Sequence, residues 1–339
     1  MKKSIILLII LFIPFCVIAK NNANNLTSVE KELMTKIELE KVFSINRSTG
    51  SGPLQNMKIT NKYIFFSQSK RTGDAVGDNS IIVLDRETKK VVKTIKYNIG
   101  HGNDITYNNR TREVMFLKSV NDFVSIVCFD YDTLEHTRDI VVEGIKDPYT
   151  ISYNNDNNSY YIANLEKGYI LDGLFQIISS FDIKTNQTIQ SFSYYDGYLY
   201  YSTFEAGGAN GYQKKYDGVF NPFDSVIYVF DINGKFVKGF YVPPIKGQLT
   251  EIEGMSFYNG EAFFVFNNWQ TAKIDVYKYN GKLLPLKNDI TNRKEDLILS
   301  DFKDMEISNS IMYIVSIILV CLVSATIIFI GNRKVKDNF

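Results

Sequence analysis

The sequence repeats one pattern five times, and this repetition limits the folds open to the chain more than any other feature. Each copy is an apolar strand that ends in a marker residue, followed by a short turn and a second strand. The markers are Asp85, Asp130, Asp182, Asp231 and, in the fifth copy, Lys278. They lie 45, 52, 49 and 47 residues apart. A period of this size is typical of equivalent units that bury their apolar faces only by stacking.

A second predicted hairpin precedes each copy. These segments begin near Met57, Asp104, Tyr149, Phe192 and Gly254. The pairs Asp196-Gly197 and Asn259-Gly260 are strong signals for two-residue hairpin turns. Two hairpins give four strands per unit, so five units predict an all-β chain folded as a five-bladed β-propeller. A β-sandwich or a set of unrelated hairpins does not account for the period.

A closed ring needs an outer strand to complete its last blade. Residues 37–43 resemble the outer strand of the other units, so we expect this N-terminal segment to close the ring. The alternative closing strand is residues 283–286.

The two ends of the chain predict a secreted, membrane-anchored protein. Lys2 and Lys3 precede a short apolar run at residues 5–18, as in a signal peptide. Residues 311–331 are uncharged and long enough to span a bilayer, and the basic residues that follow place the tail in the cytoplasm. An uncleaved N-terminal anchor and a buried soluble C-terminal helix are the alternatives.

The predicted organisation follows from these segments. It comprises a signal peptide (1–19), a linker (20–35), the propeller (36–286), a juxtamembrane spacer (287–310), a transmembrane helix (311–331) and a cytoplasmic tail (332–339). We therefore expect a single-pass protein of the cell membrane, with its propeller outside the cell.

The composition and motifs of the chain exclude several classes of function. The chain has 38 basic and 37 acidic residues, which offers no electrostatic case for binding nucleic acid. Nucleotide-binding loops, a nucleophile elbow and the zinc-protease motif are absent from the sequence. Cys128, in an apolar stretch, is the one cysteine of the predicted mature ectodomain and is expected to pack in the core. No cofactor is expected, apart from a possible Ca²⁺ ion.

The hairpins at Asp85 and Asp130 have the form Asp-x-x-Thr. In this they resemble bacterial secreted propellers of the YncE and NHL type, over roughly residues 36–286. Residues 100–107, GHGNDITY, more loosely resemble a motif of helveticin J-like propellers. The resemblance implies the propeller fold but no single function, since such propellers include binders, lactonases and scaffolds.

Long loops are predicted to gather on one face of the disk. The second-to-third strand loops of three blades are long, at residues 67–79, 165–174 and 203–224. Loops of this kind on a rigid scaffold often bind ligands. We expect Tyr212 and Tyr216 of the longest loop, and Trp269 of a shorter one, to contact a ligand, because aromatic rings offer flat contact surface. A tolerated surface insertion is the alternative for the longest loop, and a side chain that only covers the edge of a blade is the alternative for Trp269.

Polar residues are predicted to line the mouth of the central channel on the same face. They are Gln55, Asn56, His101, Asn103, Asp104, Asp147, Tyr149, Glu251 and Glu253. His101, Asn103 and Asp104 are ligand-binding candidates, and Asn103, Asp104 and Glu253 are candidates for holding Ca²⁺ through oxygen. Asp104 with Glu251 or Glu253 forms the alternative catalytic set. A polar, water-filled channel is the simplest alternative.

Three functions remain compatible with the sequence. The leading hypothesis is a recognition module that binds a surface glycan, peptide or partner protein. The alternative is an extracellular hydrolase or lactonase that uses the channel carboxylates, with or without Ca²⁺. The third is a scaffold whose transmembrane helix packs against a membrane partner.

Overall fold

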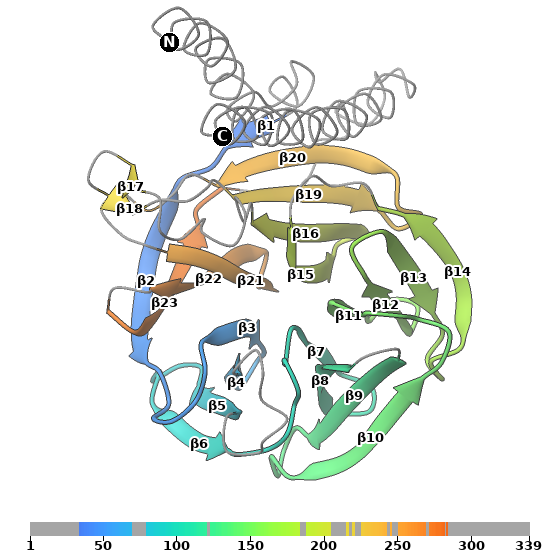
Figure 1. The fold of residues 1–339 in the computed structure, drawn as a ribbon, viewed down its shortest axis with the longest axis horizontal. Helices are drawn as coiled ribbons and strands as arrows, with labels where there is room; N and C mark the ends of the chain where they lie inside the picture. The colour runs from blue at the N-terminus through green and yellow to red at the C-terminus, as the bar shows by residue number, and fades with distance from the viewer. Residues whose placement is uncertain are drawn as a thin grey trace, which may run out of the picture. The chain divides into compact units, whose positions relative to one another are not determined.

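The computed structural model describes residues 34–69, 79–120, 123–183, 188–204, 215–216, 219–220, 225–242, 245, 250–268, 271–281 and 283. These residues belong to one compact unit, residues 33–291. They form five sheets of four antiparallel strands around a central axis, and one sheet carries a fifth strand (Figure 1). The propeller predicted from the repeat is therefore confirmed, with five blades.

Each blade contributes one strand to each of four concentric layers (Figure 1). The inner strands are β3 (Leu54–Ile59), β7 (Ile105–Asn108), β11 (Thr150–Asn154), β15 (Thr188–Tyr195) and β21 (Thr250–Tyr258). The second strands are β4 (Tyr63–Gln68), β8 (Glu113–Val120), β12 (Ser159–Ala163), β16 (Tyr198–Phe204) and β22 (Glu261–Asn268). The third strands are β5 (Ser80–Asp85), β9 (Phe123–Asp130), β13 (Lys167–Leu171), β19 (Ser225–Asp231) and β23 (Lys273–Tyr279). The outer strands are β6 (Val91–Ile95), β10 (His136–Val142), β14 (Ile177–Asp182), β20 (Phe236–Val242) and β2 (Leu39–Asn46).

Three short strands lie outside this pattern. β1 (Met34–Lys36) pairs in parallel with β20 and becomes the fifth strand of the fourth blade. Its first two residues, Met34 and Thr35, are the last two of the segment predicted as a linker. β17 (Lys215–Tyr216) pairs with β18 (Val219–Phe220) between β16 and β19.

The antiparallel order of the strands gives the disk two different faces. The turns from first to second strand and from third to fourth strand share one face, which we call the turn face. The inner strands begin at the opposite face, which we call the inlet face, and the second-to-third connections leave from it. The ends of β16 and β19 that flank the longest predicted loop lie at the inlet face.

The N-terminal strand β2 closes the ring as predicted. It pairs antiparallel with β23, from Leu39 opposite Tyr279 to Asn46 opposite Lys273. Leu283, from the alternative closing segment, is instead a single buried side chain in the core.

A buried carboxylate fastens the closing strand. Asp275 on β23 accepts hydrogen bonds from Ser44 Oγ at 2.6 Å and Asn268 Nδ2 at 3.0 Å, and pairs with Lys41 Nζ at 2.8 Å. Burial opposes ionisation of Asp275, but the bonds from Lys41, Ser44 and Asn268 outweigh it and lower its pKa. The carboxylate therefore stays charged and ties β2 to the blade it completes.

Replacing Asp275 with alanine is expected to weaken closure of the ring. The change leaves Asn268 and Ser44 without their charged acceptor, at a cost of roughly 2 kcal/mol in the free energy of unfolding. Chemical denaturation measures this, and Glu38→Ala, which removes an exposed carboxylate just before β2, is the control. Equal effects of the two variants would contradict the assigned role.

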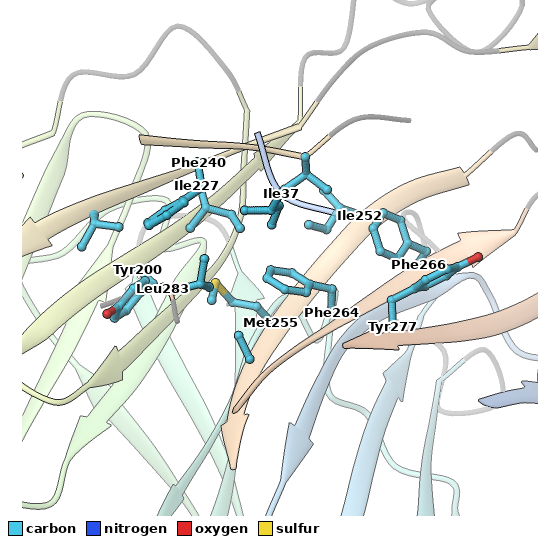
Figure 2. Close-up of a cluster of buried hydrophobic side chains, with 13 residues drawn as sticks. Ile37, Tyr200, Ile227, Phe240, Ile252, Met255, Phe264, Phe266, Tyr277 and Leu283 are labelled. Atoms are coloured by element: carbon cyan, nitrogen blue, oxygen red, sulfur yellow. The ribbon is translucent and has the colours of Figure 1, made fainter. Parts of the chain in front are cut away.

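Five buried clusters hold neighbouring blades together. Each of the five contains side chains from two adjacent blades, so the clusters cover every blade-to-blade junction of the ring. Figure 2 shows the cluster between the fourth and fifth blades, where Ile227 and Phe240 face Ile252 and Phe264. Cys128 is buried between the second and third blades, as predicted. Because each blade buries its apolar faces only against its neighbours, the ring is stable only when complete.

The strand assignment of the third repeat was wrong. We placed its marker at Asp182, but Asp182 ends the outer strand β14, and the turn after β13 is at Asp172. Asp172 accepts hydrogen bonds from the N–H groups of Leu174 and Gln176, the local role that the predicted marker should have. The predicted long loop at 165–174 therefore contains β13. The hairpin expected after Asp182 joins two different blades instead.

The predicted terminal segments lie outside the described residues. These are the signal peptide, most of the linker, the spacer, the transmembrane helix at 311–331 and the tail. Within the part of the chain that the structure describes, no helix is long and apolar enough to cross a membrane.

Candidate functional site at the channel inlet

The first residues of the inner strands form a polar ring at the inlet face. The pairing register skips one residue in three of these strands, at Gln55 in β3, Gln190 in β15 and Glu253 in β21. Asn103 and Tyr149 stand at the corresponding positions before β7 and β11. A skipped residue is a β-bulge, which redirects a side chain and is common beside functional sites. We call these five residues the inlet ring.

The side chain of Asp104 lies directly beneath the inlet ring and connects four blades. Its Oδ1 atom accepts hydrogen bonds from Asn56 Nδ2 at 2.6 Å and from its own neighbour, Ile105 N, at 2.9 Å. Its Oδ2 atom accepts from Ile151 N at 3.0 Å and Phe192 N at 3.1 Å. The fifth blade joins through Gly254, where an added Cβ would lie 2.2 Å from Asn56 Oδ1.

All four partners of Asp104 donate hydrogen bonds to its carboxylate. A carboxylate has about four acceptor positions, and here the protein occupies them all. Burial raises the pKa of Asp104 well above its usual value, while the N–H groups of Ile105, Ile151 and Phe192 and the charge of Lys58 oppose that rise. The geometry favours the charged form, because none of the four partners can accept a proton. Asp104 therefore has a structural role, because its hydrogen bonds hold neighbouring blades together. We call it the inter-blade fastener.

A layer of hydroxyl groups continues the wall below Asp104. The hydroxyls of Thr106, Ser152 and Ser256 each accept a hydrogen bond from a backbone N–H of the next blade, at 2.7 to 3.0 Å. The first blade has Lys58 at the equivalent position. Burial lowers the pKa of this partly buried lysine, and the charge of Asp104 opposes the effect.

Two glutamates meet on the fifth-blade side of the inlet ring. Glu251 and Glu253 are almost completely buried. Gln190 Nε2 donates to Glu251 Oε1 at 3.1 Å, and Asn267 Nδ2 donates to Glu253 Oε1. Asn267 also bonds both backbone groups of Leu54, so the pair is tied to the first blade.

The glutamate pair holds a proton more tightly than isolated carboxyls do. Burial, the charge of Glu251 and a hydrogen bond with Glu251 raise the pKa of Glu253 well above 4.5, against the effects of Asn267 and Arg47. Burial lowers the pKa of Arg47, and the two glutamates oppose that shift. The group thus combines a glutamate of raised pKa, its neighbour Glu251 and the nearby guanidinium of Arg47.

Asn103 supplies an acceptor that the described part of the protein does not use. Its side chain is 7% exposed, and its Oδ1 atom is buried with no hydrogen-bond partner among the described residues. The chain reaches it through Gly102, whose φ of 63° suits glycine and where an added Cβ would lie 2.8 Å from Ile99 Cδ1. Its backbone oxygen accepts from Asn56 Nδ2 at 3.1 Å, beside Gly254. Asn103 therefore stands next to the Asp104 fastener.

The structure places some of the predicted site residues at the inlet, while others lie outside the described residues. His101, Asn103, Asp104, Glu251 and Glu253 come from the inlet end, as expected, with His101 partly buried. Tyr212 and Trp269 lie outside the described residues, and of Tyr216 only the backbone, in β17, is described. Asp147 is exposed and Tyr149 partly buried.

Three residues of the channel were missed. Gln190 was missed because the third repeat was misassigned, which hid the start of the fourth inner strand. Arg47 follows β2, outside any repeat pattern. Lys58 could have been found by aligning the inner strands, since it replaces a hydroxyl residue at the same position.

The carboxylates do not gather as a metal site. Among the described residues, no group of three or more His, Cys, Asp or Glu side chains is placed to hold a metal ion. Two of the metal candidates, Asp104 and Glu253, are bonded to amide or backbone donors instead.

Comparisons with known proteins do not identify a family or a function for this chain. No protein-family model matches the sequence, and no curated protein is significantly similar to it. Among solved structures, hydrazine synthase of Kuenenia stuttgartiensis aligns with a TM-score of 0.40 and 12% sequence identity. The alignment covers 66% of this chain and 57% of that chain. So distant a match says nothing about activity.

Proposed function

We propose that this chain is a membrane-anchored surface protein whose propeller recognises a glycan at the channel inlet. The observation that carries the proposal is the Oδ1 atom of Asn103, an acceptor that no described residue uses, at the rim of a ring of amides and carboxyls. Buried polar atoms in folded proteins nearly always have a hydrogen-bond partner, so an unpaired one indicates a ligand or an ordered water.

The chemistry of the inlet ring suits hydroxyl groups. Amide side chains such as Gln55, Asn103 and Gln190 both donate and accept, as sugar hydroxyls do. Gln55 and Asn103 are close to fully buried, and Gln190 is held by Glu251, so their conformations are restricted before a ligand arrives. Restricted side chains lose little entropy on binding.

The same geometry favours binding over hydrolysis. The paired carboxyls of glycosidases lie about 5 to 9.5 Å apart, which leaves room for the sugar or a water molecule. Glu251 and Glu253 instead hydrogen-bond to each other, and Asp104 has its acceptor positions filled. The alternative hydrolase or lactonase function therefore lacks a free pair of carboxylates in the described channel.

Location outside the cell is proposed on the sequence of the ends. The apolar segments at 5–18 and 311–331, with their flanking charges, support a secreted propeller on a single-pass anchor. In that orientation the inlet ring would meet glycans of the cell surface or the surroundings.

We expect the full-length chain to bind a subset of a glycan array, and inlet variants to bind the same glycans at least tenfold more weakly. The variants are Asn103→Ala and Gln190→Ala, because each removes an amide that would bond the ligand. Affinities are measured on the array hits, with circular dichroism to confirm folding. Asn155→Ala, an exposed amide at the turn face, is the control. Failure to bind any glycan, or equal affinity of inlet variants and control, would remove the proposal; capture of a peptide instead would also contradict it.

A further inference from the structure

The hydroxyl of Thr150 is a second buried polar group at the inlet whose hydrogen bonds the protein does not supply. Like Asn103 Oδ1, the Oγ1 atom of Thr150 has no hydrogen-bond partner among the described residues. Thr150 is fully buried, and Asn103 is 7% exposed. A buried polar atom without a partner costs free energy, so two of them at one inlet indicate a bound group.

These two residues flank the carboxylate of Asp104. Asn103 precedes Asp104 in the chain, and the N–H of Ile151, which follows Thr150, donates to Asp104 Oδ2 at 3.0 Å. Asn103 comes just before β7 and Thr150 begins β11, and these two strands are neighbours at the centre of the disk (Figure 1). Asn103 belongs to the inlet ring, whereas Thr150 stands one residue further along its strand. A ligand group that binds both must therefore reach roughly 3.3 Å below the ring.

The two unpaired atoms require different partners. Asn103 Oδ1 only accepts, so its partner must be a donor, whereas the hydroxyl of Thr150 can donate to an acceptor. An acetamido group has one N–H donor and one carbonyl acceptor, which point in opposite directions. It also protrudes from the sugar ring, so it can reach the level of Thr150 while the sugar stays at the mouth. A hydroxyl attached directly to the sugar ring has a shorter reach.

The charges at the inlet favour an uncharged substituent. The carboxyl groups of Asp104, Glu251 and Glu253 share this region with one guanidinium, that of Arg47, so an anionic sugar would meet mainly acidic groups. A buried ammonium needs a carboxylate partner, yet the acceptor positions of Asp104 are already filled. An acetamido group carries no charge and avoids both costs.

Given the glycan recognition proposed above, we propose that the ligand carries an N-acetylamino sugar whose acetamido group binds between Asn103 and Thr150. The N–H of the group donates to Asn103 Oδ1, and the hydroxyl of Thr150 donates to its carbonyl oxygen. Tyr149, the partly buried aromatic residue of the inlet ring, offers its ring to the apolar face of the sugar.

The test compares chitotriose with cellotriose, which differ only in having acetamido groups or hydroxyls at the same carbon atoms. Titration calorimetry on the full-length chain measures both affinities. We expect the wild type to bind chitotriose roughly tenfold or more tightly, because cellotriose leaves the buried atoms unpaired. Thr150→Val, which has the same shape without the hydroxyl, should largely lose this preference, whereas Thr150→Ser should keep it. The melting temperature of Thr150→Val should be no lower than that of the wild type, because the hydroxyl bonds no described residue.

Four results would overturn the acetamido site and leave glycan recognition in place. Two of them, equal affinities of the wild type for the two trisaccharides and a Thr150→Val variant that keeps the full preference, would mean that the unpaired atoms hold only enclosed water. Tighter binding of the glucosamine trimer than of chitotriose would indicate an ammonium instead. A Thr150→Val variant much less stable than the wild type would show that the hydroxyl has a partner within the protein. Failure to bind any glycan is a different result, because it removes the proposed function as well.

Discussion

Replacing Asp104 with alanine is expected to lower the free energy of unfolding by roughly 3 to 9 kcal/mol. The change leaves the N–H groups of Ile151 and Phe192 and the amide of Asn56 without an acceptor, and each unpaired buried donor costs about 1 to 3 kcal/mol. Because total stability is typically about 5 to 15 kcal/mol, the variant would be close to unfolding.

Chemical denaturation measures this loss, and two further variants show its cause. Asp104→Asn keeps one acceptor oxygen but places an amide NH₂ group against hydrogen-bond donors. We therefore expect its free energy of unfolding to lie between those of the wild type and Asp104→Ala. Glu143→Ala removes an exposed carboxylate and is expected to cost little. An Asp104→Ala variant as stable as Glu143→Ala would contradict the role of Asp104 as a fastener.

Glu253→Gln is expected to make the protein less sensitive to rising pH. The folded state keeps the Glu253 proton above pH 4.5, where the unfolded chain releases it. The stabilisation is therefore complete below about pH 4.5 and is lost as the pH rises through the higher pKa of the folded protein, at up to about 1.4 kcal/mol per pH unit. Glutamine is neutral throughout and removes this part of the slope.

The measurement is the free energy of unfolding from pH 4 to pH 8 for wild type and variant. The two should be similar near pH 4.5, with the variant more stable by pH 8. Glu143→Gln, at an exposed glutamate, is the control. Parallel pH profiles for the wild type and Glu253→Gln would contradict the raised pKa of Glu253 in the folded protein.

The sequence allowed most of the fold to be predicted, because the evidence for a blade is local. An apolar strand, an aspartate that bonds the next turn and a two-residue hairpin each depend on neighbours in the chain. Asp85 and Asp130 illustrate this, since each accepts from the backbone N–H three residues later, at 2.8 and 2.7 Å. The prediction failed at the third repeat because two aspartates, Asp172 and Asp182, each follow an apolar strand. Only strand pairing distinguishes them.

The candidate site was predicted less fully. The starts of the inner strands at Asn103, Asp104, Glu251 and Glu253 were identified, since a repeat places equivalent residues at one end of the channel. Gln190 was not identified, because the misassigned third repeat hid the start of the fourth inner strand.

By itself, the sequence determined the number of blades, the strand that closes the ring and the face on which the inner strands begin. Those features follow from a pattern that recurs within each unit. The tertiary structure decided what the channel residues do, because their partners lie in other blades. Asp104 meets backbone groups 47 and 88 residues away, and Asn267 bonds a strand 213 residues earlier. A periodic sequence predicts which residues share a ring, whereas only the packing of side chains across that ring shows that Asp104 has its acceptors filled and that no described residue bonds Asn103 Oδ1.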